Sequence, residues 1–339
     1  MKAIVYPAPR TFSLDEVADP VPGPGEVRLR VRIAGLCGTD VHLHEGEFFP
    51  VYPLTPGHEI VGEVDLLGDC VTSPALGTLV VLDNMVSCGG CDACARGRPA
   101  YCRTLRALGV TDPGGFAEYV VAPATKCYDA SALPPEAAVF AEPTACAIHG
   151  LDVLDTRPGS DVLVFGAGPS GIVLAQLLRH AGAMRLTLAA PTAAKLELAR
   201  AYGVDETVLV DRDDPAAALG ALRAIAPDGF DVVVDATGAP GVLAVCLGLT
   251  GDGGTLFVYG MAAESAQLSV QPYEIFRREL TIKGSFAQSF SFDRAVLALR
   301  TGRVRTEGLV THRFSLAEYG DAIATVRDDH SCLKAVIEL

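Results

Sequence analysis

Four thiols lie close together in one short stretch of the sequence. The segment "SCGGCDACARGRPAYC", residues 87–102, has the spacing C-x2-C-x2-C-x7-C and contains Cys88, Cys91, Cys94 and Cys102. This spacing is typical of a zinc site, and four thiolates around one Zn²⁺ leave no open position for a substrate. We therefore expect a closed, structural zinc in this lobe. Reactive thiols, buried thiols or a redox switch are the alternatives, and a structural zinc would place the chemistry elsewhere.

A glycine-rich motif indicates a dinucleotide site. "GAGPSG", residues 166–171, fits G-x-G-x-x-G, follows the apolar strand expected at 161–165 and opens a helix. The glycines would permit the tight turn, the approach of a pyrophosphate and helix–strand packing, and the helix N-terminus would attract phosphate. A glycine turn without a cofactor is the alternative. The cofactor-binding residues expected here are Gly166, Gly168, Pro169, Ser170 and Gly171.

The next strand lacks the acidic residue that would bind the ribose of NAD. That acid should follow about 20 residues after the motif, but the strand ends "LTLAAPTAAK" with Ala190 at its tip. Nothing there repels a 2′-phosphate, Thr192 could donate a hydrogen bond to it, and Lys195 could supply charge or could be a solvated helix residue. We expect NADP or NAD as the cofactor and favour NADP.

Three further stretches carry side chains that could activate an alcohol for loss of hydride to such a cofactor. They are "GLCGTDVHLHEGEF", "TPGHEIVGEV" and "VFAEPTACAIHG", and they contain Cys37, Thr39, His42, His58, Glu59 and Glu142. A zinc ion with an open position would bind the alcohol oxygen and lower its pKa. Thr39 would then need only hydrogen-bond reach to that oxygen. The alternatives are that Cys37 is a buried apolar residue, that Glu142 begins a helix and that His42 is a surface histidine.

The elements that must position these residues change in character along the chain. The first 80 residues contain apolar or alternating segments between Pro/Gly clusters such as "PVPGPGE", which indicates a β-rich region. From about residue 160, short apolar strands alternate with helical periodicity, as in "DVLVFG" followed by "PSGIVLAQLLRHAG". This alternation is typical of a doubly wound parallel sheet. We therefore expect an α/β protein.

Together these motifs resemble the zinc-dependent medium-chain dehydrogenases of the alcohol dehydrogenase superfamily, particularly their polyol, or sorbitol-like, branch. The resemblance covers essentially the whole chain and depends on "CGTD", "GHEIVG", the four-cysteine lobe, the "EP" dipeptide at Glu142 and "VFGAGPSG". It implies a GroES-like β-rich catalytic domain interrupted by a Rossmann domain. The expected bounds are 1–150 and 288–339 for the first, with the zinc lobe at 84–104, and 151–287 for the second.

The resemblance also implies the ligands of a second, catalytic zinc. Cys37 and His58 match two ligands of that ion, and Glu142 falls where the polyol branch has a carboxylate ligand. Glu59 matches a glutamate that in relatives lies beside the ligands or bonds the metal directly. Two zinc ions per chain are therefore expected.

Proton transfer and assembly are implied in the same way. Thr39 matches the hydroxyl that takes the alcohol proton, and His42 the histidine that passes it toward solvent. Lys334 falls about where relatives have an arginine near the cofactor phosphates. Relatives pair subunits, commonly as tetramers, so we expect a homo-oligomer, either a tetramer or a dimer.

Composition limits the partners. The net charge of −14 argues against nucleic acid, the N-terminus lacks the apolar core of a signal peptide, and the most apolar stretch is interrupted by Gly, Pro and Ser and is a poor membrane span. We expect a cytoplasmic enzyme that transfers hydride between a secondary alcohol, a polyol or sugar alcohol, and NAD(P). The alternatives are a zinc-free quinone reductase of the same superfamily, which would lack Cys37, His58 and the lobe, and a non-catalytic zinc and nucleotide-binding protein, which would not need Thr39.

Overall fold

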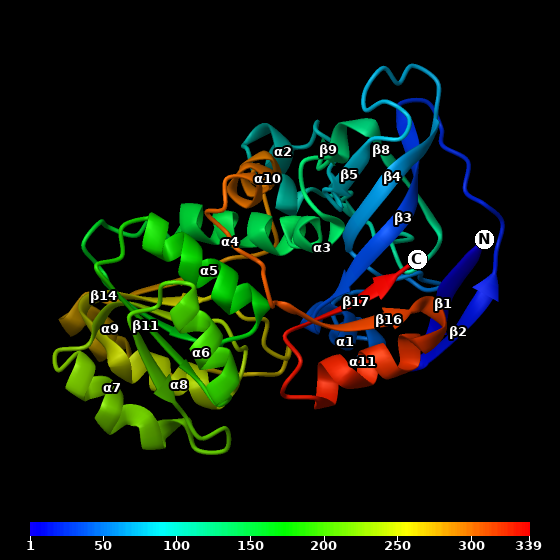
Figure 1. The fold of residues 1–339 in the computed structure, drawn as a ribbon. Coiled ribbons are helices and arrows are strands. Elements are labelled where there is room, and N and C mark those ends of the chain that lie inside the picture. Colours follow the sequence, from blue (N-terminus) through cyan, green and yellow to red (C-terminus); the bar gives the residue numbers. More distant parts are fainter. The chain divides into compact units, whose positions relative to one another are not determined.

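The computed structural model describes residues 1–339, and the chain divides into two units that are each built on a sheet of their own (Figure 1). The first unit contains Met1–Ala145 and Gln288–Leu339, and the second contains Cys146–Ala287. The last strand, β17 (Lys334–Glu338), pairs antiparallel with β3 (Glu26–Leu36), so the end of the chain completes the first unit. The α/β fold class predicted from the sequence is confirmed.

The first unit is organised around a seven-stranded sheet. Its order is β16-β17-β3-β4-β5-β9, and β8 pairs with β3 beside this path. Along β3, Val27, Leu29 and Val31 are buried while the arginines between them point outward, which is the period of two expected for a strand with one buried face. The other strands are β4 (Glu59–Leu67), β5 (Leu79–Leu82), β8 (Tyr119–Pro123), β9 (Cys127–Asp129) and β16 (Val310–Ser315).

Short elements surround this sheet. A hairpin of β1 (Lys2–Ala8) and β2 (Thr11–Glu16) forms the N-terminus, and the cysteine-rich lobe contains the small pair β6 (Met85–Val86) and β7 (Arg106–Ala107). The helices of the unit are α1 (Gly38–Glu45), α2 (Asp92–Ala95), η1 (Pro99–Tyr101), η2 (Ala124–Lys126), α3 (Pro135–Ala138), α10 (Phe292–Arg300), η4 (Leu316–Glu318) and α11 (Tyr319–Asp328).

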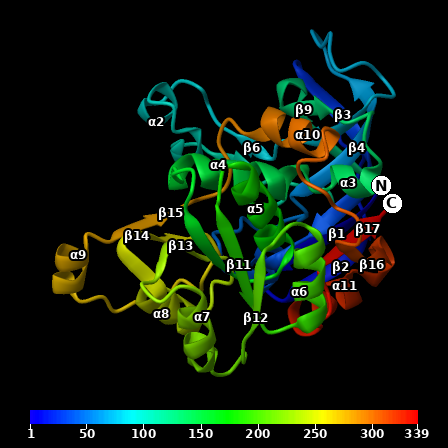
Figure 2. The same ribbon diagram turned by 60° about the vertical axis from the view of Figure 1, so that its left-hand side comes forward.

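The second unit contains a six-stranded, fully parallel sheet (Figure 2). Its order is β12-β11-β10-β13-β14-β15, so the strand order reverses between β10 and β13. The strands are β10 (Asp161–Phe165), β11 (Arg185–Ala190), β12 (Glu206–Leu209), β13 (Phe230–Asp235), β14 (Thr250–Val258) and β15 (Thr281–Gly284). The doubly wound sheet is confirmed, and its reversal marks the crevice in which such sheets bind ligands.

Helices alternate with these strands. They are α5 (Pro169–His180), α6 (Ala193–Ala201), η3 (Pro215–Ala218), α7 (Leu219–Ile225), α8 (Pro240–Leu249) and α9 (Pro272–Arg278). Leu163, Phe165, Val233 and Leu256 form part of the core beneath the sheet, each at most 1% exposed. A core of this kind fixes the carboxyl ends of the strands, where the cofactor motif lies.

One helical stretch, Pro135–Leu154, is long and apolar enough to cross a membrane by length and composition alone. Within it, 61% of the most apolar window is buried inside the protein, which is what a core helix shows. Its main part is α4 (Ala141–Leu154), which carries Glu142 in its first turn. At its other end, Lys283 Nζ donates to the carbonyls of Leu154, at 2.8 Å, and Val153, at 3.1 Å, which satisfies carbonyls left unpaired at a helix C-terminus.

Candidate active site and cofactor site

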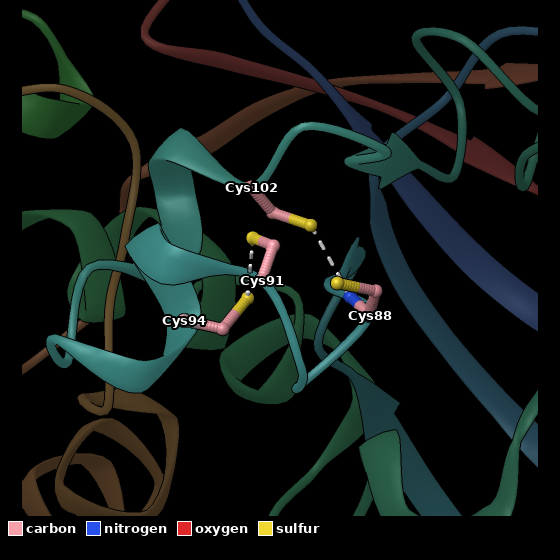
Figure 3. Close-up of side chains that lie close together, drawn as sticks. All are labelled: Cys88, Cys91, Cys94 and Cys102. Carbon is pink, nitrogen blue, oxygen red and sulfur yellow. Dashed lines mark hydrogen bonds between the residues drawn. The ribbon is translucent and has the colours of Figure 1, made fainter.

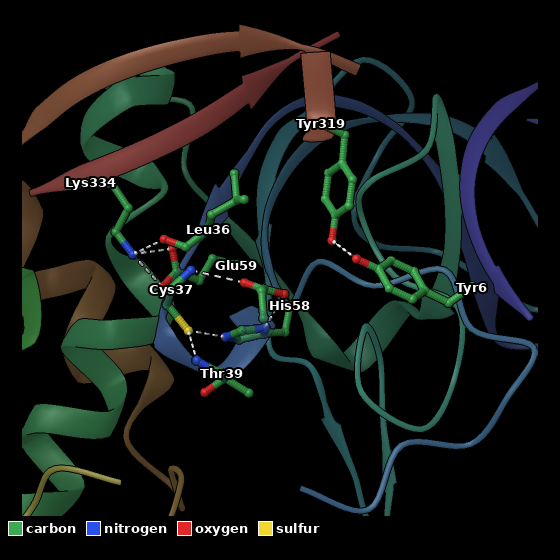
Figure 4. A network of polar contacts seen from close by, with 9 residues as sticks. Tyr6, Leu36, Cys37, Thr39, His58, Glu59, Tyr319 and Lys334 are labelled. Atoms are coloured by element: carbon green, nitrogen blue, oxygen red, sulfur yellow. Dashed lines mark hydrogen bonds and ion pairs between the residues drawn. The ribbon is translucent and has the colours of Figure 1, made fainter. Parts of the chain in front are cut away.

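Cys37, His58 and Glu59 lie together where β3 ends and β4 begins (Figure 4). Gly35 pairs with Glu59 across the two strands, which brings the residues that flank them into contact. Cys37 Sγ lies 3.1 Å from His58 Nε2, and the possible ligand atoms of all three residues lie within 4.8 Å of one another. Thiolate, imidazole and carboxylate are the donors that zinc prefers, so this set, with His58 and Glu59 buried and Cys37 half-buried, fits a zinc ion.

Asp40 orders this cluster and was missed by the sequence analysis. Cys37 is the N-cap of α1: its Sγ accepts from Thr39 N at 3.3 Å, and Asp40 Oδ2 accepts from Cys37 N at 2.9 Å. The other oxygen of Asp40 lies 3.5 Å from His58 Nδ1, and Asp40 is 1% exposed. A carboxylate behind a metal-binding histidine commonly fixes the orientation of its ring. The signal was present in "CGTD", because an acid three residues after an N-cap is the capping-box spacing.

The electrostatics around His58 favour a cation. Burial lowers the pKa of His58, but the charges of Cys37 and Asp40 outweigh this effect and raise it well above its ordinary value. The negative charges of Cys37 and Asp40 therefore favour a cation at this imidazole, as a metal ion there would be.

Lys334 forms a buried ion pair with Glu59. Its Nζ donates to the two carboxylate oxygens at 2.6 and 2.7 Å and to the carbonyl of Leu36 at 3.2 Å, and both charged side chains are 1% exposed. Burial lowers the pKa of Lys334, but the Glu59 charge overcomes this and the pKa is raised. A Cβ at Gly35 would lie 1.9 Å from Glu59 Oε2, so the pair leaves room only for glycine there. The predicted contact of Lys334 with cofactor phosphates stays a prediction, and its contact with Glu59 was not foreseen.

The other residues predicted for the catalytic site, Thr39, His42 and Glu142, lie on two helices. Thr39 is half-buried at the start of α1, and His42 lies one turn further along the same helix with its Nδ1 2.5 Å from Glu47 Oε2. Glu142 is half-buried in the first turn of α4, and its charge also raises the pKa of Lys334. Glu142 is not in the group of three residues whose ligand atoms lie within 4.8 Å, so its role as a ligand stays a prediction.

The four lobe cysteines form a second cluster (Figure 3). Their sulfur atoms all lie within 4.8 Å of one another, with Cys91 Sγ 3.6 Å from Cys94 Sγ, and Cys88 N lies 3.3 Å from Cys102 Sγ. Hydrogen bonds from the backbone N–H groups of Cys94 and Arg103 lower the pKa of Cys91 to about 6, while burial and the neighbouring Cys91 sulfur raise the pKa of Cys94 to about 11. Cys91 is therefore the thiolate of this pair, the form that binds metal. The four sulfurs offer a complete tetrahedral ligand set and leave no position for a substrate.

The glycine motif forms a tight turn between β10 and α5. Gly166 has a φ of +111°, and a Cβ at Gly171 would lie 2.2 Å from the Gly166 carbonyl oxygen, so neither position accepts a side chain without strain. A Cβ at Gly168 would meet nothing within 4 Å. Gly168 is the N-cap of α5, and no side chain accepts a hydrogen bond from the first N–H groups of that helix. The open space and the helix N-terminus suit the approach of a phosphate.

The strand tip that should select the cofactor carries no acid. Ala190 is the last residue of β11 and is 2% exposed, and its carbonyl accepts from Val210 N at 3.1 Å. Thr192 is the N-cap of α6 but makes no side-chain cap, and Lys195 lies in the first turn of that helix. The end of β11 itself therefore provides no carboxylate to hold a ribose diol.

Comparisons with known proteins agree with both sites. Residues 23–132 match the family model of the alcohol dehydrogenase GroES-like domain, and residues 169–300 match that of the zinc-binding dehydrogenases. The chain is 42% identical to D-arabinitol dehydrogenase 1 of Uromyces fabae over 100% of this chain and 97% of that protein. It is 36% identical to D-altritol 5-dehydrogenase of Agrobacterium fabrum over 87% of each.

A solved structure is also similar to this chain over its whole length. A protein from Sinorhizobium meliloti 1021, described as a zinc-binding dehydrogenase and solved with bound NADP, superimposes with a TM-score of 0.93. It is 34% identical, and the alignment covers 100% of this chain and 99% of that one.

Proposed function

The chain belongs to the zinc-dependent medium-chain dehydrogenases of the alcohol dehydrogenase superfamily, and on that premise we propose that it transfers a hydride between a secondary hydroxyl of a polyol and NADP or NAD. The observation that carries the substrate class is the 42% identity, over the full chain, to a D-arabinitol dehydrogenase. The similarity to a D-altritol dehydrogenase supports the same class.

We assign the catalytic zinc to Cys37 and His58, with Glu142 or Glu59 as the carboxylate ligand, and a structural zinc to the lobe. The donor set of half-buried Cys37 and buried His58 and Glu59 fits such an ion. When bound, the catalytic zinc supplies Lewis acidity that makes the alcohol hydroxyl easier to deprotonate. The protein's own contribution is to hold these ligands on a rigid capped helix and two paired strands.

The proton of the alcohol leaves along α1. Thr39 and His42 are three residues apart, so they are neighbours on one face of the helix. The Thr39 hydroxyl accepts the alcohol proton as it releases its own proton toward His42, and Glu47, 2.5 Å from His42 Nδ1, stabilises the imidazolium that forms. The path ends at Glu47, whose side chain is 42% exposed and is reached by water.

A substrate panel tests this function. Pentitols, hexitols, L-threonine and simple primary alcohols would each be assayed with NAD and NADP, and zinc would be counted per chain. We expect the highest kcat/KM with a polyol and about two zinc ions per chain. Turnover with L-threonine alone would reject the substrate class. One zinc and no turnover with any alcohol would support the non-catalytic alternative.

Ala190→Asp should shift cofactor preference toward NAD by about tenfold or more. A carboxylate at this tip can accept hydrogen bonds from the adenosine ribose, each contributing roughly 1.5–3 kcal/mol, and it repels a 2′-phosphate. Tenfold corresponds to about 1.4 kcal/mol. The shift should appear mainly in kcat/KM, because the adenosine end is remote from the reacting carbon. Steady-state kinetics of wild type and variant with both cofactors measure it, and a wild type that already prefers NAD a hundredfold would show that another residue holds the ribose.

Cys91→Ala should destabilise the protein or its assembly and affect turnover only through that loss. Structural zinc is coupled directly to folding, and the lobe offers no open ligand position. Thermal unfolding, zinc content and size-exclusion chromatography measure the effect, with the exposed Cys70→Ala as the matched control. A Cys91→Ala protein with wild-type stability and assembly but no turnover would mean that the thiols take part in the chemistry. The predicted dimer or tetramer is read from the same chromatogram.

A further inference from the structure

The turn of the N-terminal hairpin packs on the C-terminal end of α1, the helix that carries the proton path. Arg10 N, in the turn between β1 and β2, donates to the carbonyl of His44 in α1 at 2.7 Å. A Cβ at Gly46, the C-cap of this helix, would lie 2.8 Å from Pro9 Cγ. The hairpin has no role in the chemistry described above, yet it contacts the helix on which that chemistry depends.

The same hairpin also holds the segment that leads into β4 and the predicted ligand His58. Tyr6, in β1, donates through its backbone N–H to the carbonyl of Leu54 at 2.8 Å, and Leu54 N donates back to the Tyr6 carbonyl at 2.9 Å. The hairpin therefore contacts both segments of the chain that carry residues of the candidate active site.

The side chain of Tyr6 joins α1 to α11. Its hydroxyl lies 3.0 Å from His44 Nδ1 and 3.1 Å from the hydroxyl of Tyr319, toward which it points in Figure 4. Burial raises the pKa of both tyrosines, and the charge of Asp40 adds to this shift, so both hydroxyls keep their protons. Burial also lowers the pKa of His44. Tyr6 can therefore donate to a neutral imidazole while it accepts from Tyr319.

Aromatic rings surround the two hydroxyls and limit their movement. The ring centroid of Tyr319 lies 5.1 Å from that of Phe12 and 5.2 Å from that of Phe116, and the centroids of Tyr6 and Phe12 are 5.3 Å apart. Phe116 packs in turn on the backbone beside the metal ligands, because a Cβ at Gly57 would lie 2.8 Å from Phe116 N. Close packing of this kind fixes the Tyr6 hydroxyl, and with it the helix residue to which it is bonded.

His44 and the proton path lie on different faces of α1. Thr39 and His42 are three residues apart and share one face, whereas Asp40 and His44 are four residues apart and share another. The helix has only eight residues and is capped at both ends, so we expect it to move as one body. A bond to His44 in its last turn therefore affects the direction in which Thr39 and His42 point.

We propose that Tyr6 is a positioning residue for proton transfer: its hydroxyl joins His44 to Tyr319 and so holds α1 in the orientation in which Thr39 and His42 serve the alcohol. The inference rests on the proposed function, because it concerns the proton path assigned there. A displacement of about 1 Å at a reacting group can cost up to a hundredfold in rate. The loss of one of several contacts to α1 should cost less than that.

The central variant is Tyr6→Phe, which removes the hydroxyl and keeps the ring in the aromatic cluster. We expect kcat with a polyol to fall by about tenfold and KM to stay within about twofold of wild type. The solvent deuterium isotope effect on kcat should rise, because a misaligned Thr39–His42 pair makes proton transfer slower. Amide hydrogen exchange of residues 41–46 should become faster, because the end of α1 loses an anchor. A loss of folded protein alone would lower kcat without changing the isotope effect.

Tyr128→Phe is the matched control. Tyr128 is a half-buried tyrosine in β9 of the same unit, and its ring centroid lies 5.1 Å from that of Phe292. The loss of its hydroxyl should leave kcat, the isotope effect and the exchange of residues 41–46 at their wild-type values.

His44→Phe shows whether Tyr6 acts through α1. It removes the partner of the Tyr6 hydroxyl and should reproduce the fall in kcat and the rise in the isotope effect, and it takes the place of Tyr6→Phe if that variant does not fold. The double variant Tyr6→Phe/His44→Phe should stay within about twofold of the slower single variant, because both changes remove the same contact.

Three results would overturn the inference: wild-type kcat in Tyr6→Phe, a fall in kcat with an unchanged isotope effect, or single effects that multiply in the double variant. Each of them leaves the proposed function intact, because the wild type still turns over a polyol. A wild type that turns over no alcohol would overturn the proposed function and this inference with it.

Discussion

Cys37→Ser and His58→Ala should each lower kcat/KM for the alcohol by about a thousandfold or more, while the variants still fold and bind the dinucleotide. A Lewis acid of this kind supplies several kcal/mol of stabilisation in the transition state, and each 1.36 kcal/mol corresponds to a factor of ten. The two residues lie in the first unit, whereas the glycine motif lies in the second. Their loss should therefore leave cofactor binding intact.

The measurement combines three readouts on each variant: steady-state turnover, zinc per chain and the dissociation constant of the dinucleotide. Cys70→Ser is the control, because Cys70 is exposed and belongs to neither cysteine cluster. The expected pattern is the loss of one zinc and of turnover, with a normal dinucleotide constant. Wild-type turnover in a variant shown to lack that zinc would reject the assignment of this cluster as the active site.

The parts of the molecule that could be predicted from sequence are those whose signal is local. Ligand spacing within sixteen residues revealed the lobe, and a strand, three glycines and a helix in succession revealed the dinucleotide turn. Alternating strands and helices revealed the parallel sheet, because both periods can be counted in a short window. Gly166 and Gly171 have the steric constraints that the motif implied.

What could not be predicted depends on contacts between distant segments. Lys334 and Glu59 are 275 residues apart. Nothing in "CLKAVIEL" distinguishes a lysine that is fully buried from one at the exposed end of a strand. Tyr6 resembles any tyrosine in a strand until its bonds to His44 and Tyr319 are seen. The pairing of β17 with β3 brings Lys334 to Glu59. Residue types alone do not reveal that pairing.

Lys334→Met should lower the free energy of unfolding by about 3–5 kcal/mol. Removing one partner of a buried ion pair leaves the other charge uncompensated, and Glu59 is 1% exposed, with a hydrogen-bonded cation as its partner on both oxygens. Urea unfolding followed by circular dichroism measures the change, on protein as purified and after treatment with a chelator. The matched control is Lys283→Met. This lysine is only partly buried and contacts carbonyls at the end of α4, so its loss should cost about 0.3–1 kcal/mol.

The double variant Glu59→Gln/Lys334→Met decides why Lys334 matters. If the lysine acts by neutralising a buried carboxylate, removing that charge as well should restore at least half of the lost stability, because no unpaired ion is left. If it acts mainly by packing its stem against Phe140, whose ring centroid lies 5.9 Å from Nζ, methionine already replaces most of that contact and neither variant should lose much. A double variant as unstable as Lys334→Met alone would reject the electrostatic explanation. Recovery in the double variant together with lost zinc would show that the Glu59 charge, released from Lys334, belongs to the metal site.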